Sequence, residues 1–124
     1  MSDILVVALL DGAAVNDVSL QCLVEGRKLA DASGGKVDAL AIGSGSAAAA
    51  AGLFGYGADA VFAADDAALE SYVTSAYAAA LKGFLAENSY DVVLLPGTTS
   101  GDDLAPYVAT QLGGSAVVGA DRKR

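Results

Sequence analysis

The sequence predicts an α/β domain in which an open parallel sheet carries helices on both faces. Short apolar runs of the kind found in fully buried strands recur along the chain. Segments with apolar residues at the helical spacing of about 3.6 residues lie between these runs. The composition agrees, because 54% of the residues are hydrophobic but only 6% are aromatic. Small aliphatic side chains suit helices that pack closely on a sheet.

The first elements are a strand, a helix and a second strand. Ile4 to Leu10 is expected to be a buried strand, and Asp11 to Asp17 contains the loop after it. A helix is expected from about Asp17 to Ser33, where paired glycines stop it. Val37 to Ile42 is the expected second strand. The predicted inner face of the helix comprises Ser19, Cys22, Leu23, Gly26, Leu29 and Ala30.

An alanine-rich helix and a third strand follow. The turn Gly43-Ser44-Gly45 leads into a helix expected from about Ser46 to Phe54, because alanine, the best helix former, dominates it. The segment from Gly55 to Asp59 ends that helix. Ala60 to Ala64 is the expected third strand.

The second half supplies two more helices and two more strands. After an irregular segment to about Tyr72, a long helix is expected to reach about Glu87, and Val92 to Leu95 is a strand buried on both faces. A further helix is expected before Gly113, and Ser115 to Gly119 begins a fifth strand. The predicted inner positions are Val73, Tyr77, Ala80, Leu81 and Phe84 in the long helix, and Leu104, Val108, Gln111 and Leu112 in the later one.

The order of these elements predicts where a ligand would bind. Right-handed crossovers give the strand order 3-2-1-4-5, counted along the chain, within a single domain from 1 to 124. The order reverses between the first and fourth strands, and ligands of open α/β sheets bind at that point. The loops there are Asp11 to Asp17 and Gly97 to Asp103. The candidate binding residues are Gly97, Thr98, Thr99, Ser100 and Gly101.

Charge excludes several classes of partner. The 7 basic and 15 acidic residues give a net charge of -8. Such a surface repels phosphate backbones and anionic lipid, so we expect no nucleic-acid partner and no direct membrane insertion.

No apolar run is long enough to span a bilayer, and the amino terminus lacks the pattern of a signal peptide. A cytoplasmic location is expected, or the mitochondrial matrix if the source is eukaryotic.

Two motifs have alternative interpretations. Cys22 could be redox-active, but it is the only cysteine and lies on the predicted inner helix face, so a buried small hydrophobe is favoured. Gly43-Ser44-Gly45 could cradle a phosphate, but it lacks the third glycine of the dinucleotide fingerprint, and an ordinary turn is favoured.

The sequence contains few residues that could support catalysis or bind a metal. Asp65-Asp66 and Asp102-Asp103 could hold a metal or act as acid and base, but there is no histidine, and capping or solvated carboxylates are favoured. Thr98 and Ser100 are conceivable nucleophiles without a histidine base. We therefore expect no catalytic site and no metal site. The two carboxylates at 102 and 103 would also repel a phosphate, by on the order of 4 kcal/mol each at 4 Å.

Several stretches resemble a known family. The run from Gly97 to Ala109, with Leu112-Gly113 behind it, is similar to the helix motif in the N-terminal domain of electron transfer flavoprotein alpha subunits. The supporting stretches, which occur in the same order as in the family, are Arg27 to Asp31 before Gly34-Gly35, Tyr56 to Asp59, and Ala76 to Leu81. The resemblance spans nearly the whole chain.

The resemblance implies a fold and a role. The fold is adenine nucleotide alpha hydrolase-like, that is Rossmann-like, and the role is that of one part of a heterodimer that carries electrons from dehydrogenases to a membrane-bound acceptor. In that family FAD is bound mainly by a separate C-terminal domain of the alpha subunit, and AMP lies in the beta subunit. The C-terminal FAD-binding domain is expected to be absent here, so no cofactor is expected in this chain. The expected partners are the beta subunit and, in the full complex, the dehydrogenases.

The chain departs from the family pattern at two positions, and two functions remain open. A basic residue is usual where Asp102 stands, and arginine is common where Tyr107 stands, so no binding role is carried over to them. The favoured hypothesis is a structural and docking domain of an electron transfer flavoprotein, without its own catalytic site. The alternative is a self-contained adenine-nucleotide-binding module.

Overall fold

The computed structural model describes residues 3–12, 14–97, 103–108 and 117–119. Its centre is a sheet in the order β4-β3-β1-β5-β6, with all four neighbouring pairs parallel. The strands on this path are β1 (Ile4–Asp11), β3 (Val37–Ile42), β4 (Ala60–Ala64), β5 (Val92–Leu95) and β6 (Val117–Gly119). This path is the predicted order of five strands, so the α/β fold class is confirmed.

One strand was not predicted. In the expected loop after β1, β2 (Ala14–Val15) pairs antiparallel with the end of β1, with Leu10 opposite Val15. Gly12, at φ 69, lies between the two strands, and its left-handed conformation permits the tight reversal. The sheet is therefore mostly rather than wholly parallel, and α1 (Asp17–Ser33) begins directly after β2.

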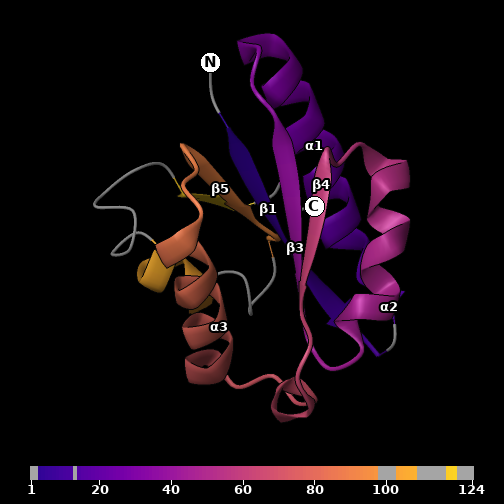
Figure 1. The fold of residues 1–124 in the computed structure, drawn as a ribbon, viewed down its shortest axis with the longest axis vertical. Helices are drawn as coiled ribbons and strands as arrows, with labels where there is room; N and C mark the ends of the chain where they lie inside the picture. Colours follow the sequence, from indigo (N-terminus) through magenta and orange to yellow (C-terminus); the bar gives the residue numbers. More distant parts are fainter. Residues whose placement is uncertain (1–2, 13, 98–102, 109–116, 120–124) are drawn as a thin grey trace.

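Helices cover both faces of the sheet, as Figure 1 shows. One face packs against α1, α2 (Ser46–Ala50) and the 3₁₀ helix η1 (Ala51–Tyr56), in a cluster that includes Val6, Ala39, Cys22 and Leu53. The other face packs against α3 (Thr74–Glu87), the short 3₁₀ helix η2 (Ala67–Leu69) and the helical residues 103–108. The alternation of inward side chains along the strands supplies both clusters.

The first helix has the predicted bounds and most of the predicted face. The Asn16 side chain accepts a hydrogen bond from the backbone N–H of Ser19 at 2.8 Å, and Gly34 ends the helix at φ 78. Gly26 lies against the sheet, where an added Cβ would stand 2.8 Å from Val6. Leu29 was wrongly placed on this face, because it is 49% exposed. Successive residues of a helix are rotated by about 100°, so the side chain of Leu29 points away from the sheet although the neighbouring Ala30 is buried.

The two following helices also differ in detail from the prediction. The alanine-rich segment is α-helical only to Ala50 and then tightens into η1, whose glycines weaken an α-helix. In α3 the fully buried positions are Tyr77, Ala78, Leu81 and Leu85. The predicted inner residues Ala80 and Phe84 are only partly buried, and Val73 is 50% exposed just before the helix. The buried face is thus rotated from the predicted one.

The later elements are confirmed as far as they are described. The central residues of β5 are buried, as expected for a strand covered on both sides. Leu104 and Val108, from the predicted later helix, are fully buried in the same cluster as α3. Gln111 and Leu112 lie outside the described residues. The predicted fifth strand is β6, in parallel register with β5.

Candidate functional site

The predicted ligand-binding point lies at the carboxyl ends of β1 and β5, which are neighbours in the sheet. Gly97, the first of the candidate binding residues, is half-buried in a bend just after β5. The other candidates, Thr98, Thr99, Ser100 and Gly101, lie outside the described residues, as does Asp102. On the described side of this point, the geometry is set by the start of α1, the turn after β3 and the segment around η2.

The start of α1 is held by groups of the chain itself. Asn16 caps the helix, and its backbone N–H donates to the carbonyl of Leu9 at 2.9 Å. The buried hydroxyl of Ser19 accepts a hydrogen bond from the backbone N–H of Leu9 at 3.0 Å. A capping side chain satisfies an amide that a bound anion would otherwise use. The start of α1 is therefore hydrogen-bonded to Leu9 of β1 through both Asn16 and Ser19.

An internal carboxylate occupies the glycine turn after β3. The backbone N–H groups of Gly45 and Ala47 donate to the two carboxylate oxygens of Asp65, at 2.8 and 3.1 Å. Gly43 and Gly45 have positive φ, 150 and 86, which only glycine adopts easily. The turn does present amides to an anion, but the anion is the chain's own side chain. The interpretation as an ordinary turn is thereby favoured over a phosphate cradle.

The neighbouring aspartate is a helix cap. Asp66 precedes η2, and its carboxylate accepts a hydrogen bond from the backbone N–H of Ala68 at 2.9 Å. The interpretation of Asp65 and Asp66 as capping groups is therefore confirmed. In the described ranges, no cluster of three or more histidine, cysteine, aspartate or glutamate residues could hold a metal ion.

Two tyrosines pack beside η2, in the cluster on the α3 side of the sheet. The hydroxyl of Tyr77 donates to the carbonyl of Leu69 at 2.7 Å, and the ring of Tyr72 lies 4.8 Å from that of Tyr77. Burial raises the pKa of Tyr72, and the nearby negative charge of Asp103 raises it further. Leu69 itself is buried in the core.

A small pocket remains between these groups. It encloses about 120 Å³ and is lined by Leu10, Gly12, Gly43, Ser44, Leu69, Glu70, Tyr72 and Tyr77. Pockets that bind cofactors and drug-sized ligands usually enclose roughly 300–1,000 Å³. This pocket by itself is smaller than that range, and Glu70 adds a negative charge to it.

Cys22 is a core residue. It is 1% exposed on the inner face of α1, and burial raises the pKa of its thiol to about 12, with a smaller contribution from the charge of Glu25. The reactive form of cysteine is the thiolate, which this environment suppresses. The interpretation as a buried small hydrophobe is confirmed.

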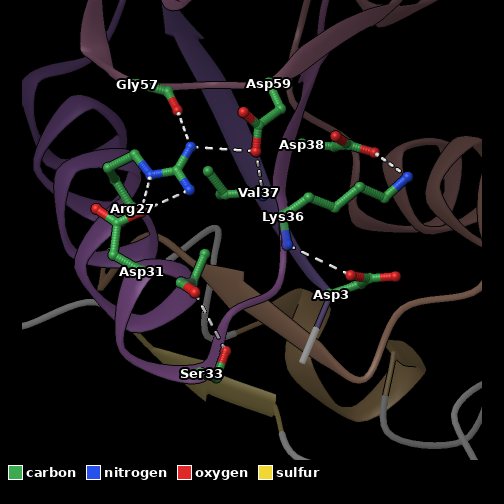
Figure 2. Close-up of polar contacts among 10 residues, drawn as sticks. Asp3, Arg27, Asp31, Ser33, Lys36, Val37, Asp38, Gly57 and Asp59 are labelled. Atoms are coloured by element: carbon green, nitrogen blue, oxygen red, sulfur yellow. Dashed lines mark hydrogen bonds and ion pairs between the residues drawn. The ribbon is translucent and has the colours of Figure 1, made fainter. Parts of the chain in front are cut away.

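The polar network shown in Figure 2 lies at the opposite edge of the sheet, where β3 and β4 begin. Arg27 of α1 donates to the carbonyl of Gly57 at 3.0 Å and forms ion pairs with Asp31 and Asp59 at 2.8 and 3.1 Å. Asp59 also accepts the backbone N–H of Val37 at 2.9 Å, and this hydrogen bond, followed by Arg27, lowers its pKa. The network joins two of the stretches that carry the family resemblance, and its contacts are structural.

A buried carboxylate lies next to this network. Asp38 of β3 is 2% exposed, and its Oδ2 accepts a hydrogen bond from the hydroxyl of Tyr90 at 2.7 Å. The Nζ of Lys36 lies 3.6 Å from the same oxygen. The other oxygen, Oδ1, has no hydrogen-bond partner within the described part of the chain. The sequence analysis missed this pair, although a charged residue inside an apolar strand pattern is a signal for it.

Comparisons with known proteins agree with this fold and these motifs. Residues 4–121 match the family model of the electron transfer flavoprotein domain. The electron transfer flavoprotein subunit alpha of Megasphaera elsdenii is 40% identical over 98 residues, which are 79% of this chain and 29% of that protein. The subunit alpha of Thermoanaerobacterium thermosaccharolyticum is 38% identical over 96 residues, or 77% of this chain and 29% of that protein.

A differently named relative matches a similar span. Protein FixB of Rhizobium meliloti is 38% identical over 107 residues, which are 83% of this chain and 30% of that protein. The chain thus spans about three tenths of the length of the curated relatives it matches. None of the helices in the described ranges is long and apolar enough to cross a membrane. The family match covers nearly the whole chain, and the chain belongs to the electron transfer flavoprotein domain family.

Proposed function

We propose that this chain is a structural and docking domain of an electron transfer flavoprotein and has no catalytic site of its own. It occupies the place of the alpha subunit's N-terminal part, FAD is held by other parts of the assembly, and the principal partner is the beta subunit. Dehydrogenases join the full complex, which works in the cytoplasm or, in a eukaryote, in the mitochondrial matrix. The relatives named as alpha subunits of electron transfer flavoproteins support this role.

The observation that carries the proposal is that, among the described residues, side chains of the chain itself occupy the backbone amides that a ligand anion would use at this edge. Asp65 accepts hydrogen bonds from the amides of Gly45 and Ala47, Asn16 caps α1, and the pocket between β1, β3 and η2 encloses about 120 Å³. A phosphate would have to displace an internal carboxylate from that turn and meet the charge of Glu70 nearby. At about 4 Å and an effective dielectric of about 20, each such repulsion is on the order of 4 kcal/mol before screening.

Calorimetric titration of the purified chain with AMP, ATP and FAD tests the absence of a nucleotide site. We expect a colourless protein and no binding heat at moderate salt. An Asp65→Asn variant serves as a matched control, because it keeps a side chain of the same shape but removes the charge. Stoichiometric flavin that survives gel filtration, or micromolar AMP binding by the unmodified chain, would favour the self-contained adenine-nucleotide-binding module instead.

A further inference from the structure

We propose that the outer edge of β4, with the groove between β4 and α3, binds an extended apolar segment of a partner protein that carries a basic residue at one end. The inference rests on the proposed docking role and gives it a location. It has three independent supports, which are an unprotected strand edge, an apolar groove beside that edge, and a negatively charged rim.

The edge of β4 lacks the usual protection of an edge strand. β4 is the last strand on its side of the sheet path, and no strand among the described residues pairs with its outer side. Its sequence, AVFAA, contains no charge and no proline, and its register with β3 is unbroken from Ala60 to Ala64. Natural edge strands are usually blunted by charges, proline or bulges. An uncharged, regular edge is a template for one more strand.

The groove lies on the α3 side of that edge. It encloses about 450 Å³, and its walls include Ala64, Leu69, Ala76, Ala79 and Ala80. The side of α3 that lines it carries only the small side chains of Ala76, Ala79 and Ala80. Ala79 is exposed, and Ala64, Ala76 and Ala80 are partly buried.

Aromatic rings continue the apolar surface along β4. Phe62 is 38% exposed, and its ring lies 5.1 Å from that of Phe84 on α3. Phe62 pairs in register with Leu40, and Ala64 pairs with Ile42, both from the cluster on the α3 side. Phe62 and Ala64 therefore project toward the groove side, because alternate residues of a strand share a face. Aromatic residues of this kind are enriched at protein interfaces.

Two aspartates at one end of the groove, which we call its rim, favour an occupant with a positive charge. Asp65 and Asp66 line one end of the groove and are exposed, while none of its lining residues is basic. Their hydrogen bonds are to backbone amides, and no basic side chain of the described residues forms an ion pair with either of them. A basic residue on the partner complements this end. A second copy of a chain with net charge -8 would bring like charges together, which disfavours self-pairing.

A single extended segment accounts for the edge and the groove together. As an added strand it pairs with the free backbone groups of β4, and every second side chain then falls on the groove side. A helix lying in the groove would leave the edge of β4 unpaired. The occupant is therefore a strand with small or β-branched apolar residues on its groove side and a lysine or arginine near Asp66.

The test titrates the chain with the electron transfer flavoprotein beta subunit of the same organism and follows hydrogen exchange of residues 60–64. Ala79→Glu puts a charge into the groove wall, and Ala86→Glu puts the same change on an exposed position of α3 outside the groove. We expect Ala79→Glu to weaken binding by about tenfold or more, since a buried unpaired charge is costly, whereas Ala86→Glu changes it by less than about twofold. Exchange at 60–64 should slow on binding.

Asp66→Asn tests the charged rim separately, because asparagine caps a helix as well as aspartate does. Its binding should be weaker at low salt by about threefold, and the difference should shrink at high salt, as expected for a screened charge pair. Binding that is unaffected by Ala79→Glu and leaves exchange at 60–64 unchanged would overturn the β4 site while leaving the docking role intact. No binding at all would overturn both. A dimer of the chain alone that Ala79→Glu dissociates would overturn the choice of occupant.

Discussion

Removing the hydroxyl of Tyr90 should destabilise the domain, because this hydroxyl is the only group that hydrogen-bonds the buried carboxylate of Asp38 among the described residues. Asp38 is 2% exposed near the start of β3, and the O···O distance to Tyr90 is 2.7 Å. In Tyr90→Phe the ring stays and can still stack on Phe84, whose centroid is 6.1 Å away. Only the hydrogen bond is lost.

The size of the effect follows from the charge of the acceptor. A hydrogen bond to a charged group contributes about 1.5–3 kcal/mol, and a buried charge left without its partner costs more than the bond alone. Lys36, whose Nζ lies 3.6 Å from Asp38 on the solvent side, offsets part of that cost. We expect Tyr90→Phe to lower the free energy of unfolding by about 2 kcal/mol in urea denaturation, with an unchanged slope.

A double variant separates this explanation from simple loss of packing. Asp38→Leu with Tyr90→Phe removes both polar partners, and such paired replacement is close to neutral when shape is kept. The double variant should therefore be more stable than Tyr90→Phe alone. A Tyr90→Phe variant within about 0.5 kcal/mol of the native protein, or a double variant whose loss equals the sum of the single losses, would refute the reasoning.

The same pair predicts a pH dependence. Burial, and then the hydrogen bond to Asp38, raise the pKa of Tyr90 above its ordinary value. The unfolded chain therefore loses this proton first, near pH 10, while the folded protein keeps it. This contribution to stability is full below pH 10 and is lost as the pH rises toward the folded pKa, by about 1.4 kcal/mol per pH unit. In Tyr90→Phe the alkaline decline measured by urea denaturation should be shallower by that amount, and an unchanged decline would contradict the assignment.

Three further predictions concern stability and reactivity. Gly57→Ala should lower stability by about 1–2 kcal/mol, because Gly57 has φ 107 and an added Cβ would stand 3.0 Å from Arg27. Gly83→Ala, with open space at its Cβ, should instead stabilise α3 by up to about 1 kcal/mol. Equal effects of the two substitutions in thermal unfolding would contradict this difference. Cys22 should react with a thiol reagent at pH 8 only after unfolding, so a rapid stoichiometric reaction of the folded protein would contradict its burial. Asp65→Ala should lower the free energy of unfolding, measured by urea denaturation, by about 1 kcal/mol, because two backbone amides lose their acceptor. The loss should be smaller than in Tyr90→Phe, because these amides can bind water. A loss near zero would show that the carboxylate does not hold the turn.

Local signals were strong enough to predict most of the fold. The bounds of α1 follow from Asn16 before the helix and Gly34 after it, and β3 and β4 follow from apolar runs between glycine and aspartate turns. The position of Leu29 and the face of α3 could not be predicted by spacing alone. The residues at the border of an apolar helix face are buried or exposed according to the orientation of the helix on the sheet, and the spacing of apolar residues does not specify that orientation.

Long-range contacts account for the rest of what the sequence analysis missed. Arg27, Gly57 and Asp59 occur in two separate stretches of the family resemblance, and only the fold brings them together. The Asp65 carboxylate accepts a hydrogen bond from the amide of Gly45, 20 residues away, so a glycine turn that resembles a phosphate cradle already holds an anion. The pairing of β2 with β1 involves only two residues, too few to give a periodic pattern.

Sedimentation velocity of an equimolar mixture with the beta subunit, at micromolar concentration, tests the docking role most directly. The account predicts one boundary that sediments faster than either protein alone, without added nucleotide and without bound flavin in this chain. Two independent boundaries at every concentration would contradict it, whatever other ligands the chain binds.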